Sequence, residues 1–267
     1  MAARPPGGAE REFPWWLAVA CGLGLWLLVA ILLDPIYGQI LGIVAQGVWV
    51  TVYVTVVAFA LASALGLGLA VCVLSGSVVL RQVARFYIEI VRGIPILVLL
   101  FYIAFVAVPG LVAGWNAVAA AVGLEPMQTR DVSLMWRAII ALMLGYAAFI
   151  AEVFRAGIQS VDPGQIEAAK ALGLTGWQRF RLVVLPQAVR TILPPLGNDF
   201  IALIKDSALV SVLGVADITQ LGKVYAAGSF RFFETYNVVA FLYLVMTVGL
   251  SLGLRGLERR LRRRTAG

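Results

Sequence analysis

The chain has 267 residues, of which 61% are hydrophobic and 13% are charged, and its mean hydropathy is +0.94. Soluble domains carry about 25% charged residues, so the composition excludes a soluble globular protein and indicates an integral membrane protein. The sequence contains no histidine, which excludes His-based metal sites, Ser–His triads and His proton relays. The formal net charge is +7, but six arginines crowd between Arg255 and Arg264, directly after an apolar run. That placement is typical of a juxtamembrane tail beside anionic lipid and argues against a nucleic-acid partner.

Six segments are apolar over the roughly 20 residues that a membrane-spanning helix needs. The apolar runs are long and continuous, whereas strands of a membrane β-barrel alternate over about ten residues. The predicted fold class is therefore all-α, a polytopic membrane-spanning helical bundle with about six transmembrane helices. The expected spans cover residues 15–33, 43–74, 88–112, 134–153, 192–215 and 238–254.

The distribution of Lys and Arg predicts the orientation of these spans. If the N-terminus lies inside, the inner segments hold fifteen basic residues and the outer loops hold four. Both termini are therefore expected on the cytoplasmic side. The outer segments 113–133 and 216–235 mix aromatic residues and glycine with a few charges, and we expect short interfacial helices or a docking surface there.

The segment 162–186 is polar within an otherwise apolar chain. Residues 167–172 are strong helix formers, and the preceding Asp-Pro-Gly suits a helix start. Gly173 is expected to end this helix, Thr175 to cap a second one and Pro186 to end it. Two short helices with a tight turn suit docking into a groove on another protein. Alternatively, they form amphipathic helices that lie on the lipid.

This segment resembles the EAA motif of permease subunits of binding-protein-dependent ABC importers. The family pattern is E-A-A, three residues, G, nine residues, I, one residue, L-P. In that family the loop is the coupling helix that fits a groove on the ATPase subunit, so the resemblance favours docking. Ala168 and Ala169 leave the first helix nearly bare, which allows another backbone to approach. The resemblance implies that seven residues couple to the ATPase: Glu167, Ala168, Ala169, Gly173, Val183 in place of the isoleucine, Leu185 and Pro186.

Three further stretches, at 89–105, 149–174 and 185–219, resemble the polar amino acid branch of that family, the histidine and glutamine permease group. The likeness covers about residues 42–257. One departure is KDSAL at 205–209, where the branch often has K-D-T-S-L, so a hydroxyl is missing there.

The resemblance implies a five-helix type I importer core with one additional N-terminal helix. Residues 1–41 would form the cytoplasmic N-terminus and the extra helix, 42–257 the transmembrane domain with its EAA loop at about 160–187, and 258–267 a basic tail. The implied partners are an ABC ATPase in two copies, a second permease chain, identical or homologous, an extracytoplasmic amino-acid-binding protein and membrane lipid. The implied location is a bacterial inner membrane.

The resemblance implies that the chain is not an enzyme and binds no cofactor of its own. The sequence contains no P-loop pattern G-x-x-x-x-G-K-[ST], so ATP and Mg are expected on the partner ATPase. The implied substrate is a polar amino acid.

Ionisable residues inside predicted spans are unfavourable in lipid, so they are usually functional or paired. Glu89 and Arg92 stand three residues apart on one helical face, just before Pro95 breaks the helix. Glu152 and Arg155 repeat this spacing. Each pair is interpreted either as an interfacial salt bridge or as part of a gate.

A second group of polar residues interrupts the span at 192–215. Asn198 and Asp199 lie near its start if the helix begins later than drawn, whereas Lys205 and Asp206 lie about 8–10 Å deeper, at 1.5 Å per residue. Lys205 is adjacent to Asp206 and is expected to neutralise it. The hypothesis is that these two residues, together with Glu89, Arg92 and Glu152, line the translocation path or a gate.

Small residues in the second span, ASALGLGLA at 62–70, favour close helix packing, expected within a permease dimer. Two other function classes remain as alternatives. An ion-gradient-driven secondary transporter of a small polar solute would fit the charges within spans, but no internal repeat supports it. A membrane enzyme ranks last, because the chain has no metal-ligand cluster and no clear nucleophile–base set.

Overall fold

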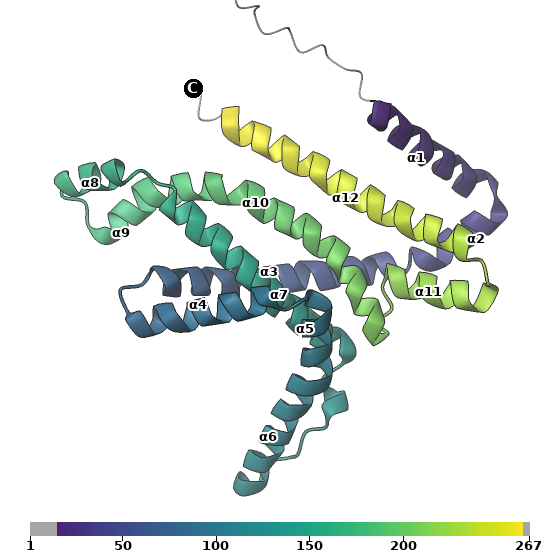
Figure 1. Cartoon of the computed structure of the whole chain (residues 1–267), viewed down its shortest axis with the longest axis horizontal. Coiled ribbons are helices and arrows are strands. Elements are labelled where there is room, and N and C mark those ends of the chain that lie inside the picture. The colour runs from purple at the N-terminus through teal and green to yellow at the C-terminus, as the bar shows by residue number, and fades with distance from the viewer. Residues whose placement is uncertain (1–14, 264–267) are drawn as a thin grey trace, which may run out of the picture.

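The protein is built from helices that are joined by short turns, as a computed structural model describes it over residues 15–263 (Figure 1). No strand occurs in that range, which confirms the all-α prediction. Two π-helical segments, η1 and η3, and two 3₁₀ segments, η2 and η4, interrupt or extend the α-helices. In chain order the elements are α1 (Trp15–Leu33), α2 (Pro35–Val44), α3 (Gly47–Leu74), α4 (Val78–Gly93), α5 (Ile96–Tyr102), η1 (Ile103–Ala107), α6 (Val108–Val122), η2 (Thr129–Asp131), α7 (Leu134–Gln159), α8 (Pro163–Ala171), α9 (Gly176–Arg179), η3 (Phe180–Val184), α10 (Leu185–Asp206), η4 (Ser207–Leu213), α11 (Ile218–Ser229) and α12 (Phe232–Arg263).

The core is the pairing of α3 with α7, and α10 and α4 pack against this pair. Small residues make the close approach possible, because a Cβ at Gly66 would lie 3.0 Å from the carbonyl oxygen of Ala147. Gly66 and Ala70 are both buried within the chain. The expectation of a dimer contact is therefore wrong for these two positions, since both are covered by the same chain, Gly66 by α7. Gly68, by contrast, has no atom within 4 Å of a Cβ placed on it.

Four stretches of the described chain are long and apolar enough to cross a membrane: Pro35–Leu74, Ile96–Val122, Leu134–Gln159 and Phe232–Gly256. They correspond to four of the six predicted spans. The first predicted span is helical over its full length as α1. The fifth is α10, which continues into η4 and carries Asp199, Lys205 and Asp206.

The expected span at 88–112 is wrong at its beginning. Residues 88–93 belong to α4, an amphipathic helix that packs beside α3 and α7. The chain then leaves the helix at Ile94, which is extended (φ −100°, ψ 129°) as the residue before a proline usually is. A new helix begins at Ile96 and runs through η1 to Val122. Pro95 therefore separates two helices of different direction instead of bending one.

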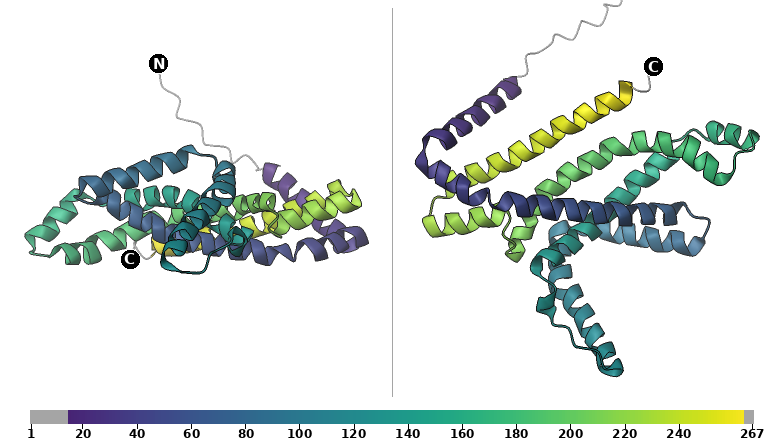
Figure 2. Two further views of the ribbon diagram at one scale, coloured as in Figure 1. Left: turned by 90° about the horizontal axis from the view of Figure 1, so that it is seen from below. Right: turned by 180° about the vertical axis from the view of Figure 1, so that it is seen from behind.

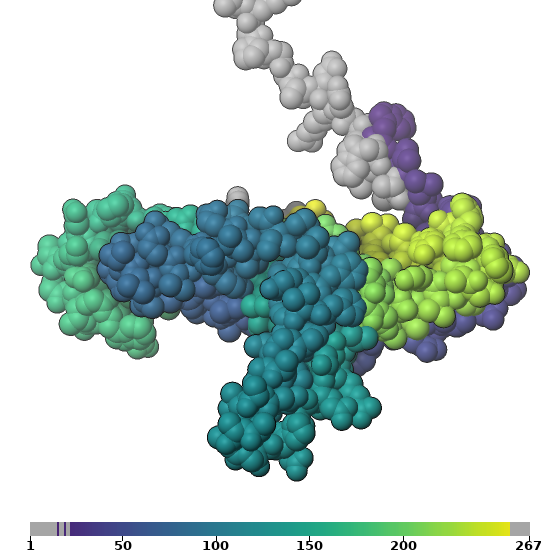
Figure 3. All heavy atoms as spheres, turned by 60° about the horizontal axis from the view of Figure 1, so that its bottom comes forward, coloured from purple at the N-terminus to yellow at the C-terminus, as the bar shows by residue number. Residues whose placement is uncertain are grey.

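The segment from Ile96 to Asp131, here called the arm, projects away from the rest of the molecule (Figures 1 and 3). It is attached mainly through α5 and η1, which pack on α7. The expected loop at 113–133 is thus largely helical, because α6 extends to Val122.

Arg137 of α7 attaches the arm to the body. This side chain is 7% exposed. Its guanidinium donates to the carbonyl oxygens of Val132 (2.9 Å), Ala104 (3.0 Å) and Thr129. Ala104 lies in the π-helical η1. Arg137 therefore joins α7 to two other segments of backbone, η1 and the turn at 129–132.

The two ends of the molecule carry short helices. The α8–α9 hairpin lies at one end and α11 at the other (Figure 1). The expectation of a short helix within 216–235 is confirmed by α11. Asp217 is fully buried and caps α11, where its carboxylate accepts from the backbone N–H of Gln220 (2.8 Å) and from the Tyr243 hydroxyl (3.1 Å). Burial raises the pKa of the Asp217 carboxyl, and these hydrogen bonds oppose the rise.

Helices α1 and α12 converge near α2 and diverge away from it, as two opposite views show (Figures 1 and 2). A second apolar cluster joins them at the converging end, where Ile31, Tyr37, Ile40 and Val238 are buried together. The remainder of α1 has little covering from the described part of the chain, with Leu23 and Leu25 each 62% exposed.

Candidate functional site

The α8–α9 hairpin has the local geometry that the sequence predicts. Asp162 caps α8 by accepting from the backbone N–H of Gly164 (2.7 Å). Gly173 follows the helix end with φ +75°, a left-handed conformation that favours glycine. Thr175 and Gln178 form a reciprocal capping box at the start of α9. The helix–turn–helix prediction is confirmed.

The prediction that Pro186 ends the second helix is wrong. Helix α9 passes without a break through η3 into α10, and Pro186 lies in the first turn of α10. A proline lacks the N–H that a preceding carbonyl would need and clashes with the turn before it. The wider π-helical turn of η3 directly before Pro186 accommodates this, so the helix continues into α10.

One hydrogen-bonded side chain connects the two halves of the hairpin. The Gln187 amide of α10 donates to the side-chain oxygen of Gln165 in α8 (2.6 Å) and to the Val183 carbonyl oxygen in η3 (2.9 Å). A displacement of α8 therefore acts on the beginning of α10 directly. Such a connection suits a part that transmits force into a membrane helix.

The EAA residues differ in exposure. Glu167 and Ala168 are exposed, whereas Ala169 is 4% exposed and packs inside the hairpin. Gly173, Leu185 and Pro186 are exposed, and Val183 is half-buried. Ala169 therefore fixes the packing of the hairpin and offers no surface.

Two exposed apolar side chains at the tip of the hairpin were not predicted from the sequence. Leu172 is 81% exposed and Trp177 is 68% exposed, and the Trp177 ring stacks on Phe180 with centroids 5.8 Å apart. Both flank Gly173. A Trp and a Leu beside a glycine turn in a polar loop are the signal that would have found them, since exposed aromatic residues of this kind anchor interfaces.

Tyr146 of α7 binds Asp206 of α10 in the core of the molecule. The Tyr146 hydroxyl donates to the Asp206 carboxylate (2.7 Å), and the residues are 60 positions apart. Asp206 is half-buried and Lys205 is exposed. Lys205 makes no ion pair with Asp206 in the described range, so the expectation of local neutralisation is wrong. On a helix, adjacent residues point in different directions, and Asp206 instead faces α7.

Asp199 lies seven residues before Asp206, about 10 Å along α10 at 1.5 Å per residue. One of its carboxylate oxygens is buried without a hydrogen-bond partner among the described residues. Asn198 is exposed. The structure therefore brings Asp199 and Asp206 to one side of α10, where Asp206 meets Tyr146, whereas Lys205 and Asn198 are exposed.

The two predicted pairs behave differently. Glu152 and Arg155 form an ion pair, with the guanidinium Nε 3.1 Å from the carboxylate, and Arg155 also donates to Gln159 (2.7 Å). Glu89 and Arg92 are both exposed and form no ion pair in the described range. Arg92 instead lies over the Phe149 ring, 5.6 Å from its centroid.

These contacts have α7 in common. Tyr146, Phe149, Glu152 and Arg155 follow one another at intervals of three residues, so the set winds by about 60° per step from one side of α7 to the other. We call this set the α7 stripe. It contacts α10 through Asp206 and α4 through Arg92. No group of three metal-ligating side chains was found among the described residues.

The arrangement of the elements agrees with that of known membrane permeases. A solved structure titled as an amino acid ABC transporter with histidines has a TM-score of 0.69 and 36% identity, covering 82% of this chain and 94% of that one. The structure of the MetNI methionine ABC transporter shares the fold, with a TM-score of 0.63 and 24% identity over 82% of this chain and 96% of that one.

Sequence relatives give the same result. The probable amino-acid permease protein YxeN of Bacillus subtilis is 38% identical over 203 residues, which is 76% of this chain and 84% of the relative. The glutamine transport system permease protein GlnP of Escherichia coli is 38% identical over 189 residues, which is 70% of this chain and 78% of the relative. Residues 62–266 match the family described as binding-protein-dependent transport system inner membrane component. The chain therefore belongs to this family, whose members are the non-catalytic permease subunits of ABC importers.

Proposed function

We propose that this chain forms half of the translocation path of an ATP-driven importer for polar amino acids. The relatives at 38% identity are named as amino-acid and glutamine permeases, which supports the substrate class. In this proposal a second permease chain, identical or homologous, completes the path, and an extracytoplasmic binding protein delivers the amino acid. ATP and Mg are bound by a separate ATPase, and the chain itself holds no cofactor.

The α8–α9 hairpin is the observation that carries the proposal. Its exposed tip, with Leu172 and Trp177 on either side of Gly173, presents an apolar surface to a groove on the ATPase. Continuity of α9, η3 and α10 provides a rigid route from that surface into the membrane. The Gln187–Gln165 hydrogen bond adds a second connection between the docking helix and the same span.

Within the membrane, the proposed path follows the polar side of α10 that faces the α7 stripe. Asp206 is held by Tyr146, so it is oriented before any substrate arrives. Movement of α10 away from α7 would break this hydrogen bond, and movement back would restore it. The pair is therefore suited to a gate. Glu152 and Arg155 form an ion pair within α7, near the end of this helix that leads to the hairpin. Glu89, Arg92 and Lys205 lie exposed on the surface of the isolated chain, where a second permease chain could cover them.

The domain arrangement follows from the same proposal. Residues 42–257 form the importer domain, residues 1–41 form the cytoplasmic N-terminus and the additional helix, and 258–267 form the basic tail. With fifteen inner and four outer basic residues, both termini face the cytoplasm of a bacterial inner membrane.

Co-purification of the tagged chain from gently solubilised membranes tests the proposal. Gly173→Asp places a side chain at φ +75° and is expected to distort the turn, so the ATPase should be lost. Gly176→Asp is the matched control, because it adds the same charge to the same loop at the first residue of α9, where an acidic side chain is favourable.

The expected result is an ABC ATPase recovered with the wild type and with Gly176→Asp, and reduced at least tenfold with Gly173→Asp. Recovery of the wild-type chain without any ATPase would contradict the proposed coupling. Equal recovery with both variants would show that the hairpin turn is not the docking element.

A further inference from the structure

Helix α1 lies entirely outside the part of the chain that matches the permease family, which begins at residue 62. It is held at its C-terminal end, where Ile31 is 6% exposed, while Val19 and Leu32 are 60% and 72% exposed. The uncovered surface of α1 is therefore available to bind a ligand or partner.

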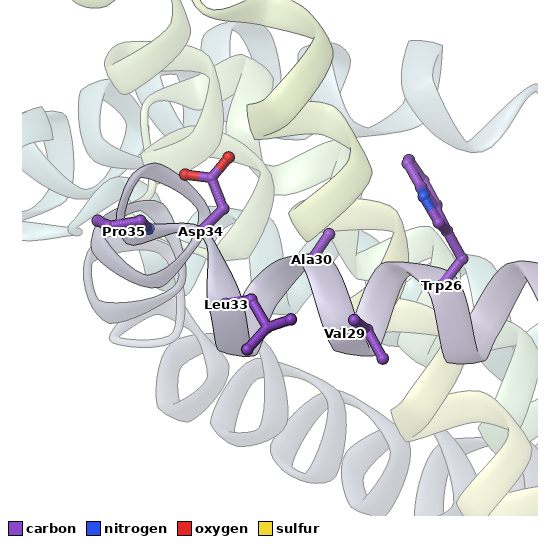
Figure 4. A pocket seen from close by; sticks show the side chains of 6 residues that line it. All are labelled: Trp26, Val29, Ala30, Leu33, Asp34 and Pro35. Carbon is purple, nitrogen blue, oxygen red and sulfur yellow. The ribbon is translucent and has the colours of Figure 1, made fainter.

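A groove lies at the corner where α1 turns into α2 (Figure 4). Its volume is about 470 Å³, and it is open to the surroundings. Ala30 lies between Trp26 and Asp34, and the three residues project from the same side of the chain. A small residue between two larger ones at intervals of four makes a notch on the helix surface. The lining residues are Trp26, Val29, Ala30, Leu33, Asp34 and Pro35.

Asp34 provides the polar end of this groove. One carboxylate oxygen accepts from the backbone N–H of Ile36 (2.8 Å) and so caps α2. The other oxygen has no hydrogen-bond partner within residues 15–263. A carboxylate beside an apolar notch in a membrane helix is complementary to a ligand with a positive charge at one end and a hydrocarbon chain behind it.

We propose that this groove binds one phospholipid of the outer leaflet whose headgroup carries a primary ammonium group, such as phosphatidylethanolamine. With the N-terminus inside, as the distribution of Lys and Arg predicts, the α1–α2 corner lies at the outer surface. The ammonium group donates to the free oxygen of Asp34, and an acyl chain lies over Ala30 toward Trp26. These positions are eight residues apart, about 12 Å along the helix, which is the length of roughly nine methylene groups.

Native mass spectrometry of the full-length chain, purified in mild detergent, tests this site. The chain is incubated with phosphatidylethanolamine or phosphatidylglycerol of identical acyl chains. Wild-type protein should retain one phosphatidylethanolamine about tenfold more strongly than phosphatidylglycerol, which corresponds to one charge-assisted contact. Equal retention of both lipids would overturn the proposal.

Three variants separate the roles of the residues. Ala30→Leu fills the notch and should reduce retention of both lipids, whereas Leu32→Phe enlarges an exposed side chain outside the lining and should leave it unchanged. Asp34→Asn keeps an oxygen for the Ile36 N–H, so α2 stays capped, but should abolish the preference for the ammonium headgroup. Asp34→Glu should restore that preference, and its failure to do so, with the helix content of the variant unchanged, would contradict the charge pairing.

A cross-linking experiment in native membranes examines the other occupants of the groove. With Val29→Cys, a cross-link to phosphatidylethanolamine carrying a reactive acyl chain supports the proposal. A cross-link to a second copy of the chain or to another membrane protein in place of lipid would overturn it. None of these outcomes depends on transport, so failure here leaves the permease function standing.

Discussion

At the scale of single residues, the most important contact is the hydrogen bond between Tyr146 and Asp206. It is the contact through which a carboxylate on α10 is satisfied inside the predicted membrane region. An ionised group in lipid is unfavourable unless it is paired or hydrated. The bond therefore contributes to stability and also fixes the position of α10 against α7.

Tyr146→Phe should destabilise the protein, because it removes the hydroxyl that donates to the half-buried Asp206. The expected loss is about 1–3 kcal/mol, as for an acceptor left without its donor. The measurement is thermal unfolding of the purified chain in detergent. Tyr53→Phe is the control, since Tyr53 is also half-buried on a packed helix but makes no side-chain hydrogen bond in the described range. An unfolding temperature for Tyr146→Phe equal to that of Tyr53→Phe would show that the contact is not maintained.

This contact also marks the limit of sequence interpretation. The EAA turn could be predicted because Asp162, Gly173 and Thr175 act on backbone atoms only a few residues away. Tyr146 and Asp206 are separated by 60 residues, so their meeting depends on how α7 packs against α10. Lys205 is adjacent to Asp206 in the sequence and was expected to neutralise it, but helical geometry directs the two side chains apart.

At the scale of elements, the close packing of α3 on α7 determines the shape of the core. Gly66→Ala should destabilise the chain by about 1–3 kcal/mol, because the new Cβ would meet the backbone of α7 at 3.0 Å and 3.1 Å. The same substitution two residues later, Gly68→Ala, meets no atom within 4 Å. It should be neutral or slightly stabilising, since alanine favours the helix. The check is the fraction of folded protein recovered from size-exclusion chromatography after stepwise heating, and an equal loss in both variants would contradict this packing.

The arm is a second element with a defined attachment. Arg137→Gln removes most of the donors that hold Val132, Ala104 and Thr129, so the arm should become looser. Hydrogen exchange of peptides covering 103–107 and 129–132 should accelerate at least tenfold, because a buried hydrogen bond to a charged group is worth about 1.5–3 kcal/mol. Arg130→Gln is the control, since Arg130 is exposed on the same arm. Unchanged exchange in Arg137→Gln would show that α5 and η1 hold the arm through apolar contacts alone.

The helices around two prolines also explain where the sequence predictions of a span and of a helix end failed. Pro95 and Pro186 both occur within helical patterns, yet the first separates two helices and the second lies in the first turn of a continuous one. The difference is the π-helical turn of η3 before Pro186, which creates the space that the proline ring needs. The π-helical η1 stands in the same position before Pro109, in the first turn of α6.

At the scale of the whole molecule, the features are arranged from one end to the other. The α8–α9 hairpin lies at one end, α7 and α10 cross the middle, and α11 with buried Asp217 lies at the opposite end. This order suits a machine in which a movement at the hairpin reaches the far side through rigid helices. An ion-gradient-driven transporter would need no such hairpin.

The most direct test is uptake into vesicles that contain the chain with its partner subunits, with the nucleotide on the side of the hairpin. Labelled glutamine, glutamate, histidine and arginine are offered with the binding protein. The account predicts uptake of at least one of them only when ATP is present, with uptake lost in Gly173→Asp and kept in Gly176→Asp. Uptake by the chain alone, driven by an ion gradient without ATP, would contradict the account and establish a secondary transporter.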